Sequence, residues 1–205
     1  MNNMDKSLLM CDSTEGDGKA EIVMDYVMSW SLRHATDEYI KSQPILSEYC
    51  RYMLGVLLDI TIGNDTQVES VKVWKEWQNI DLCVEAIIKQ GETTTHYALL
   101  IENKYYSKLH DNQLQRYQAV FNAYYEKKND EIKEDENKWK LLHKLVSCFD
   151  IQDQLEKLYT EGMKDTEFTG LTFYKLLCPE KWRDEEKKYE DSESEIFNEF
   201  WLRRW

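Results

Sequence analysis

The chain has 205 residues, of which 42% are hydrophobic and 32% are charged. This length suits one domain with a substantial core, and the hydrophobic content excludes a disordered chain. Asp and Glu number 39 against 26 Lys and Arg, so the formal net charge is −13. That balance excludes a broad basic surface for nucleic acid, so any contact with phosphate must be local or be completed by a partner.

The cysteines and the N-terminal residues predict a cellular compartment. The five cysteines are odd in number and far apart, and they form no C-x-x-C pair. This pattern favours reduced thiols over a disulfide framework or a zinc site. Residues 1–10 carry an acid, Asp5, and only a short apolar run, which is not typical of a signal peptide, and no run is long enough to span a membrane. We expect a cytoplasmic protein without a membrane partner.

Two helices are predicted in the first third of the chain. Polar residues 1–18 predict a loose N-terminal arm, and residues 19–205 are expected to form a single domain. Beyond Lys19, apolar residues recur at helical spacing; they are Ile22, Val23, Tyr26, Val27 and Trp30. Pro44 begins a second apolar stripe that is predicted to end near Gly63.

The second predicted helix carries two candidate site residues. Glu48 lies in its first turn, where the helix dipole favours a carboxylate and no further role is needed. The alternative is that Glu48 reaches an active site as an extra acid. Arg51 follows one turn later, either as a solvated side chain or as a phosphate contact.

Three strands are predicted next, and the last two form a hairpin. Val68 to Trp77 alternates loosely, and its Trp74 and Trp77 are interpreted as core or rim residues, with base stacking as the alternative. The runs Ile80–Ile88 and Tyr97–Lys104 flank Gly91-Glu92, which predicts a β-hairpin. A type II′ turn with Gly91 at its first central position places Asp81 opposite Glu102.

This register gathers ionisable groups on one face of the hairpin. Asp81, Glu102 and Lys104 share that face because side chains alternate along a strand, and the opposite face is mostly apolar. Two carboxylates at cross-strand distance repel each other unless a cation lies between them. Oxygen ligands of this kind suit Mg²⁺, with Mn²⁺ as the alternative. Lys104 would orient or deprotonate an attacking water and stabilise charge on phosphorus.

A helix is predicted from about Asn112 to Lys127. Its Gln113 and Tyr117 are one turn apart and share a face, so both can contact the end of the hairpin. The alternative is a solvated Gln113 and a core Tyr117. The basic residues near this point predict where a phosphodiester would approach; they are Lys104, Lys108, His110 and Arg116.

The rest of the chain is predicted to be an insertion, a strand and a helix. Residues 128–165 are charged with one apolar stripe, which predicts an acidic helical insertion with a solvated face; contact with a protein partner is the alternative. Leu171–Cys178 is assigned as the fourth strand, with Leu141–Val146 as a rival. Residues 195–205 predict an amphipathic helix.

The order of these motifs resembles a known family. Asp81, a hairpin and then Glu102-Asn103-Lys104 are similar to the PD-(D/E)xK nuclease superfamily, with Ile80 where the name-giving proline would be. Gln113-Leu114-Gln115-Arg116-Tyr117 matches the Q-x-x-x-Y element of RecB-like members. The helix that starts near Glu48 is similar to the first helix of the family. The resemblance spans about residues 48–117.

The resemblance implies a fold and a function. The expected fold is α/β, with a restriction-endonuclease-like core and a four-stranded mixed sheet flanked by helices. The expected function is metal-dependent hydrolysis of nucleic-acid phosphodiesters, with DNA preferred over RNA. The resemblance implies Asp81, Glu102 and the Asn103 carbonyl as metal ligands and Lys104 acting on water. Supporting and substrate-binding roles fall to Glu48, Gln113, Tyr117, Arg116, Lys108 and Arg51.

Two other hypotheses stay open on the sequence. An acid that starts a strand and an E-x-K triplet on an edge strand are also typical of a solvated face. The chain would then be a catalytically inactive protein of the nuclease fold that acts as a binding or regulatory module through its acidic surface. A different α/β fold, in which these acids have no function, is the third reading.

Overall fold

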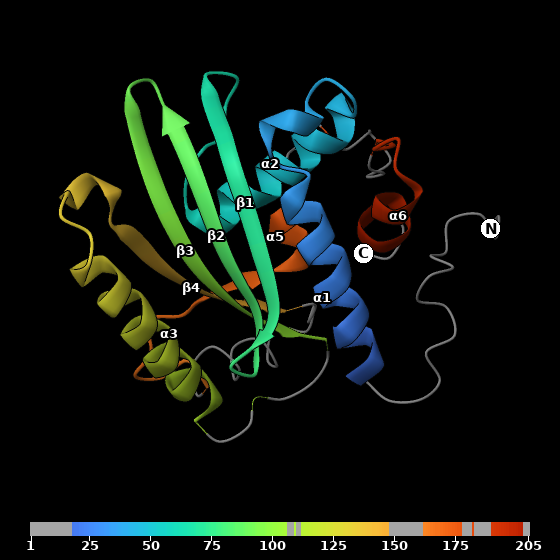
Figure 1. Ribbon diagram of the computed structural model, residues 1–205. Coiled ribbons are helices and arrows are strands. Elements are labelled where there is room, and N and C mark those ends of the chain that lie inside the picture. Colours follow the sequence, from blue (N-terminus) through green and yellow to red (C-terminus); the bar gives the residue numbers. More distant parts are fainter. Residues whose placement is uncertain are drawn as a thin grey trace.

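A computed structural model describes residues 18–105, 109, 112–147, 162–177, 182 and 190–202, with backbone alone at 18–20 and 174. Its elements form three layers, in which a central sheet lies between two groups of helices (Figure 1). None of the helices in this part of the chain has the length and apolar character needed to cross a membrane. The predicted arm, residues 1–18, lies outside the described residues except for Gly18.

The two predicted N-terminal helices are present. Helix α1 spans Gly18–Arg33 and α2 spans Pro44–Leu58, with the short 3-10 helix η2 (Asp37–Tyr39) between them. Proline suits the first turn of α2 because its missing N–H would have no partner there. The helix ends before the predicted Gly63, since Asp59 is left-handed with φ 56°.

Within the described residues, the sheet has five strands in the order β1-β2-β3-β4-β5. The strands are β1 (Thr66–Trp77), β2 (Ile80–Gln90), β3 (Thr93–Lys104), β4 (Trp139–Ser147) and β5 (Thr169–Thr172). The first three pair antiparallel, and β3, β4 and β5 pair parallel. A parallel pair needs a crossover; α3 (Gln113–Asp130) and η3 (Asp135–Asn137) supply it between β3 and β4.

The predicted hairpin register is confirmed. Leu82 pairs with Ile101 and Gln90 with Thr93, so Gly91-Glu92 form the two-residue turn. Gly91 has φ 60°, whereas Glu92 has no positive φ. That combination agrees with a type II′ turn. The hairpin therefore directs its apolar and ionisable faces as the sequence predicts.

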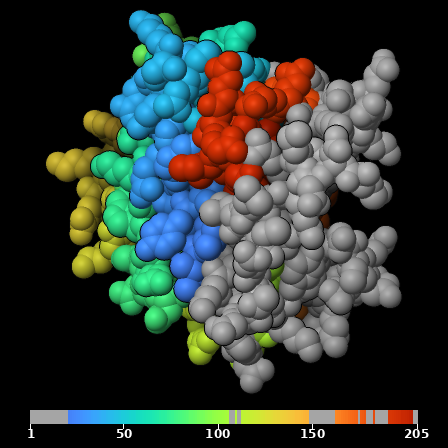
Figure 2. All heavy atoms as spheres, turned by 90° about the vertical axis from the view of Figure 1, so that its right-hand side faces the viewer, coloured from blue at the N-terminus to red at the C-terminus, as the bar shows by residue number. Residues whose placement is uncertain are grey.

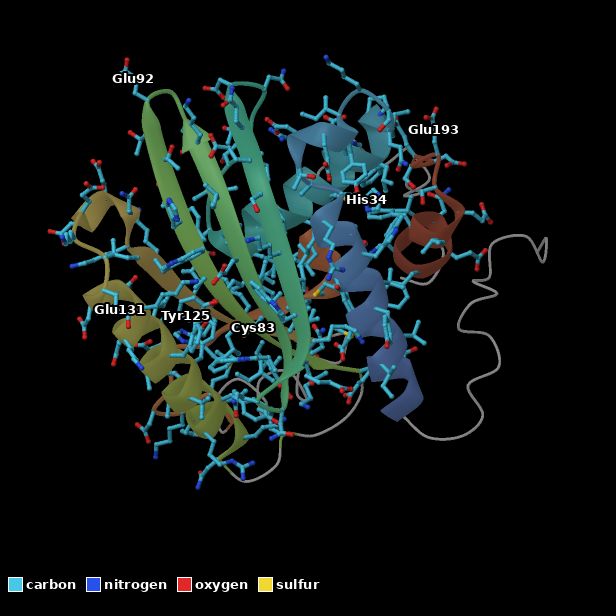
Figure 3. The ribbon with its side chains drawn as sticks, in the orientation of Figure 1. His34, Cys83, Glu92, Tyr125, Glu131 and Glu193 are labelled. Atoms are coloured by element: carbon cyan, nitrogen blue, oxygen red, sulfur yellow. The ribbon has the colours of Figure 1, made fainter. Side chains whose placement is uncertain are left out.

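Each face of the sheet has its own core. Leu82, Val84 and Leu99 pack with α1, α2 and the C-terminal segments. Cys83 and Leu100 lie on the other face and pack with residues of α3. Figure 3 shows Cys83 on the sheet and Tyr125 on α3 lying on this second side.

The sequence analysis was wrong about two segments in the second half of the chain. Residues 139–147, within the predicted helical insertion, form β4, so the described sheet has five strands where four were predicted, and the rival strand is the correct one. The strand lies between β3 and β5, and such buried parallel strands do not show the alternation that marks a half-exposed strand. The predicted strand Leu171–Cys178 is also wrong beyond Thr172, because Phe173–Leu177 form helix α5.

The C-terminal segments pack beside the first two helices. Helix α5 contacts α2, and α6 (Glu195–Phe197) is followed by a π-helical turn, η6 (Asn198–Leu202). Trp201 Nε1 donates to Ser31 Oγ on α1 over 3.0 Å. Figure 2 shows this segment against α1 and α2. The rest of the predicted C-terminal helix and residues 148–161 of the predicted insertion lie outside the described residues.

Side chains bond main-chain atoms along the edge strand β1. The Val68 N–H donates to Asp37 Oδ1 over 2.9 Å, and Arg33 donates to the Val73 carbonyl over 2.8 Å. Arg51 donates to the Thr66 carbonyl over 2.5 Å. The register of β1 also shifts between Val68 and Ser70. Helical residues thus bind an edge that has no neighbouring strand in the described sheet.

A left-handed residue near the end of β1 changes the direction of a tryptophan. Glu76 has φ 56°, which residues other than glycine rarely adopt. Lys75 lies on the α1 side, with Nζ 3.0 Å from the centre of the Tyr26 ring, and simple alternation would place Trp77 on that side too. Trp77 instead packs against Tyr124 of α3, with ring centroids 5.0 Å apart. The irregular backbone at Glu76 therefore turns Trp77 towards α3.

We expect Glu76→Gly to increase the free energy of unfolding by about 1 kcal/mol, because glycine adopts positive φ without the Cβ clash. Urea denaturation of both proteins measures the change. Gln67→Gly, at an exposed β1 position without positive φ, is the control and should lower stability by about 0.5–1 kcal/mol. Equal destabilisation by both substitutions would contradict a strained Glu76.

Candidate active site

The predicted ionisable groups meet where β2 begins and β3 ends. Lys104 Nζ lies 2.6 Å from Glu102 Oε1, and both side chains are buried. The Asn103 N–H donates to Asp81 Oδ2 over 2.9 Å. The Asp81 and Glu102 carboxyls are also close enough for a hydrogen bond between them to influence the pKa of each. The structure thus brings together the two acids and the lysine that the hairpin register predicts.

Helix α3 supplies the next contacts. Gln113 Nε2 donates to Glu102 Oε1 over 2.6 Å and to the Tyr117 hydroxyl over 3.2 Å. Both residues therefore face the end of the hairpin, as their one-turn spacing predicts, and Gln113 is buried and not solvated. One amide group fixes one oxygen of Glu102 and orients Tyr117.

The electrostatics of the cluster favour bound protons or a cation. Burial, with a smaller contribution from Asp81, raises the pKa of Glu102 to about 8. Burial also raises the pKa of Asp81, although the Asn103 N–H and Lys104 oppose the shift. For Lys104, burial acts to lower the pKa, but attraction to Glu102 and other acids outweighs it and the pKa is raised. Lys104 is therefore an ammonium ion in this arrangement.

Helix α1 contributes two acids that the sequence analysis missed. Asn103 Nδ2 donates to Asp25 Oδ1 over 2.7 Å, and the Tyr105 N–H donates to Glu21 Oε1 over 3.0 Å. Burial, followed by repulsion from Asp81, raises the pKa of Asp25 to about 7. The i, i+4 spacing of Glu21 and Asp25 was a usable signal, since it predicts two acids on one face of the helix.

The structure does not bring Glu48 and Arg51 to this cluster. Arg51 bonds Asp37 over 2.6 Å and the Thr66 carbonyl, and Glu48 lines the same pocket. Thr66 pairs with Gln90 at the opposite end of the sheet, roughly 30 Å of strand from the start of β2. The extra acids come from α1 and not from α2, because α1 is the helix whose side chains reach the end of β3.

Two predicted basic residues, Lys108 and His110, lie outside the described residues. Arg116 is exposed on the first turns of α3. It lies one residue before Tyr117, on the helix that supplies Gln113 to the cluster. Its position is compatible with a contact to a ligand that approaches this end of the sheet.

The donor atoms can be tested against a divalent cation. Within the described ranges, no group of three or more His, Cys, Asp or Glu side chains could hold a metal ion by itself. Glu102 Oε2 is nevertheless buried, and no hydrogen-bond donor reaches it from the described part of the chain. Mg²⁺ is commonly bound by one or two carboxylates and several waters. Asp81 and Glu102 therefore fit such an ion.

Fold and site together define an α/β protein with an acid, acid and lysine cluster at the end of a hairpin. The family model described as the PD-(D/E)XK nuclease superfamily matches residues 13–193, and the chain belongs to this superfamily. The resemblance seen in the sequence is thereby confirmed.

Two further comparisons add little to the family match. Among solved structures, the MspJI restriction endonuclease in complex with a 27-mer oligonucleotide is 10% identical with a TM-score of 0.29. The match covers 80% of this chain and 31% of the endonuclease chain, so this chain spans less than a third of the length of the endonuclease. No curated protein matches.

The raised pKa of Glu102 predicts how stability depends on pH. The folded protein keeps this proton up to about pH 8, whereas an ordinary Glu loses it near 4.5. The stabilisation is therefore complete below pH 4.5 and is lost as pH rises to about 8. In EDTA, we expect the free energy of unfolding to fall by on the order of 4 kcal/mol between pH 5 and 8.

Glu102→Gln should reduce that fall, because the amide does not titrate. Denaturation at several pH values measures it, with Glu92→Gln at the exposed hairpin turn as the control. Identical pH profiles for the wild type and Glu102→Gln would contradict the expectation.

Proposed function

We propose that this chain is a metal-dependent nuclease that hydrolyses phosphodiester bonds, with DNA preferred over RNA and Mg²⁺ preferred over Mn²⁺. The observation that carries the proposal is Glu102 Oε2, a buried carboxylate oxygen beside a second carboxyl, to which none of the described residues donates a hydrogen bond. A purely structural carboxylate would be expected to have both oxygens satisfied. Membership of a nuclease superfamily supports the same conclusion.

In this proposal, Asp81, Glu102 and the Asn103 backbone carbonyl would hold the metal ion. A bound divalent cation would stabilise negative charge on the phosphate and lower the pKa of an attacking water. Gln113 holds Glu102 Oε1 and so leaves Oε2 for the ion. Asp25 accepts a hydrogen bond from the Asn103 side chain, and Glu21 accepts one from the Tyr105 N–H. These two contacts fix the end of β3.

Lys104 acts as a positioned cation in this scheme. Its ammonium lies 2.6 Å from Glu102 Oε1, and its raised pKa keeps it protonated. It would therefore orient the attacking water and stabilise charge on phosphorus, and it would not remove a proton while Glu102 holds it in this state. Tyr117 and Arg116 would contact the substrate on the α3 side, and Lys108 stays a proposed substrate contact from the sequence alone.

We expect Asp81→Asn, Glu102→Gln and Lys104→Ala each to lower the rate of Mg²⁺-dependent plasmid nicking by about 10²–10³-fold, because each removes charge that acts on the reacting phosphate. The rates are measured at saturating DNA with and without EDTA. Glu48→Gln is the matched control: it removes an acid from the distant α2 pocket and should leave the rate unchanged.

The opposite results would favour a different function. If neither DNA nor RNA is cleaved and calorimetry detects no Mg²⁺ binding, the proposal fails. The chain would then be a non-catalytic member of the superfamily whose acidic surface contacts a protein partner. Loss of activity in Glu48→Gln would instead contradict the assignment of the site to the β2 and β3 ends.

A further inference from the structure

An exposed apolar strip extends from the candidate active site across α3 to the edge of the sheet. We define the aromatic strip as Trp74, Trp77, Tyr117, Val120 and Tyr124. Its members are exposed or half-buried: Trp74 is 41%, Val120 43% and Tyr124 49% exposed. Apolar groups in such a row often mark a binding surface.

The strip is continuous with the catalytic cluster. Tyr117 accepts a hydrogen bond from Gln113, which also bonds Glu102. Val120 lies three residues after Tyr117 and Tyr124 four residues after that, so the three share one side of α3. Tyr124 contacts Trp77 with ring centroids 5.0 Å apart. A ligand on the strip would therefore lead to the proposed reacting groups.

Two features of β1 add the tryptophans to this surface. Trp74 pairs with Cys83, which belongs to the α3-side core, so Trp74 faces the same side. Trp77 reaches that side only because of the left-handed backbone at Glu76. Strained residues of this kind often occur at functional sites. Here the strain presents a second indole to the strip.

The charges beside the strip indicate which ligand it would take. Arg116 precedes Val120 by one turn, Lys127 follows Tyr124 by nearly one turn, and Lys72 lies two residues before Trp74 on the same strand face; all three are exposed. Acids lie next to these cations too: Glu76 and Glu126 are exposed, and Glu85 is the cross-strand partner of Lys72. Aromatic faces flanked by cations suit bases joined by phosphates, since bases stack on the rings and phosphates contact the cations.

We propose that the aromatic strip binds the unpaired bases of a single DNA strand and directs that strand to the Asp81 and Glu102 cluster. The inference rests on the proposed nuclease function and names its substrate class. In a duplex the base faces are covered by neighbouring base pairs, so only an unpaired strand offers them to Trp74 and Tyr124. Stacking also gives affinity that does not depend on a large basic surface, which a chain of net charge −13 lacks.

Binding to fluorescent oligothymidylate in EDTA tests the inference without hydrolysis. By fluorescence anisotropy, the full chain should bind the single strand more tightly than a hairpin duplex of equal length. Trp74→Ala and Tyr124→Ala should each weaken the binding by about five- to hundredfold. Tyr124→Phe keeps the ring and should keep the affinity, and Ile196→Ala, a 53% exposed apolar residue on α6, is the control.

Several results would overturn the inference. They are equal or tighter binding of the duplex, no binding of the single strand, unchanged affinity in both alanine variants, and a wild-type dimer that Trp74→Ala converts to a monomer. Thermal unfolding checks that each variant is folded, and two independent alanine variants keep the test decisive if one fails. Binding without cleavage would refute only the nuclease function. Cleavage with an unchanged KM in both alanine variants would refute only the proposed binding of the single strand by the aromatic strip.

Discussion

The site depends on holding two carboxyl groups together inside the protein. Asp81 and Glu102 directly follow the Leu82–Ile101 pair at the end of the β2–β3 ladder, and burial makes their mutual repulsion stronger than it would be in water. The structure offsets this repulsion with the Lys104 ammonium, the Gln113 amide and the Asn103 N–H. These three groups satisfy one oxygen of each acid. The remaining oxygen of Glu102 receives no hydrogen bond within the described ranges, which leaves a place for a proton or a cation.

The architecture supplies each compensating group from a different segment. The antiparallel hairpin sets the two acids opposite each other, and the parallel pairing of β3 with β4 requires a crossover that places α3 beside the end of β3. Helix α1 approaches the same end from the other face and holds Asn103 and Tyr105 through its acids. The cluster is therefore assembled from residues far apart in the chain, although its central triad lies within one hairpin.

The sequence predicts the parts of the site that depend on local rules. A two-residue turn and the period of a strand were enough to place Asp81 opposite Glu102, and helical spacing was enough to place Gln113 with Tyr117. The choice between α1 and α2 as the source of further acids depends on how the helices pack on the sheet, and no local pattern around Glu48 encodes that. The sequence offered strand β4 only as a rival assignment, because Trp139, Leu142 and Val146 fit a helical stripe, whereas burial on both faces removed the alternation of a strand.

Strand β1 lies at an edge of the described sheet, and this position affects whether molecules can associate through their sheets. An uncovered edge strand is a template on which another chain can add by backbone pairing, the first step of many aggregates. Here Asp37, Arg33 and Arg51 bind its main-chain groups, and the register shift near Val68 interrupts its regularity. Arg51 and Asp37, which form an ion pair with each other, thus hinder the addition of a strand from another molecule to this edge.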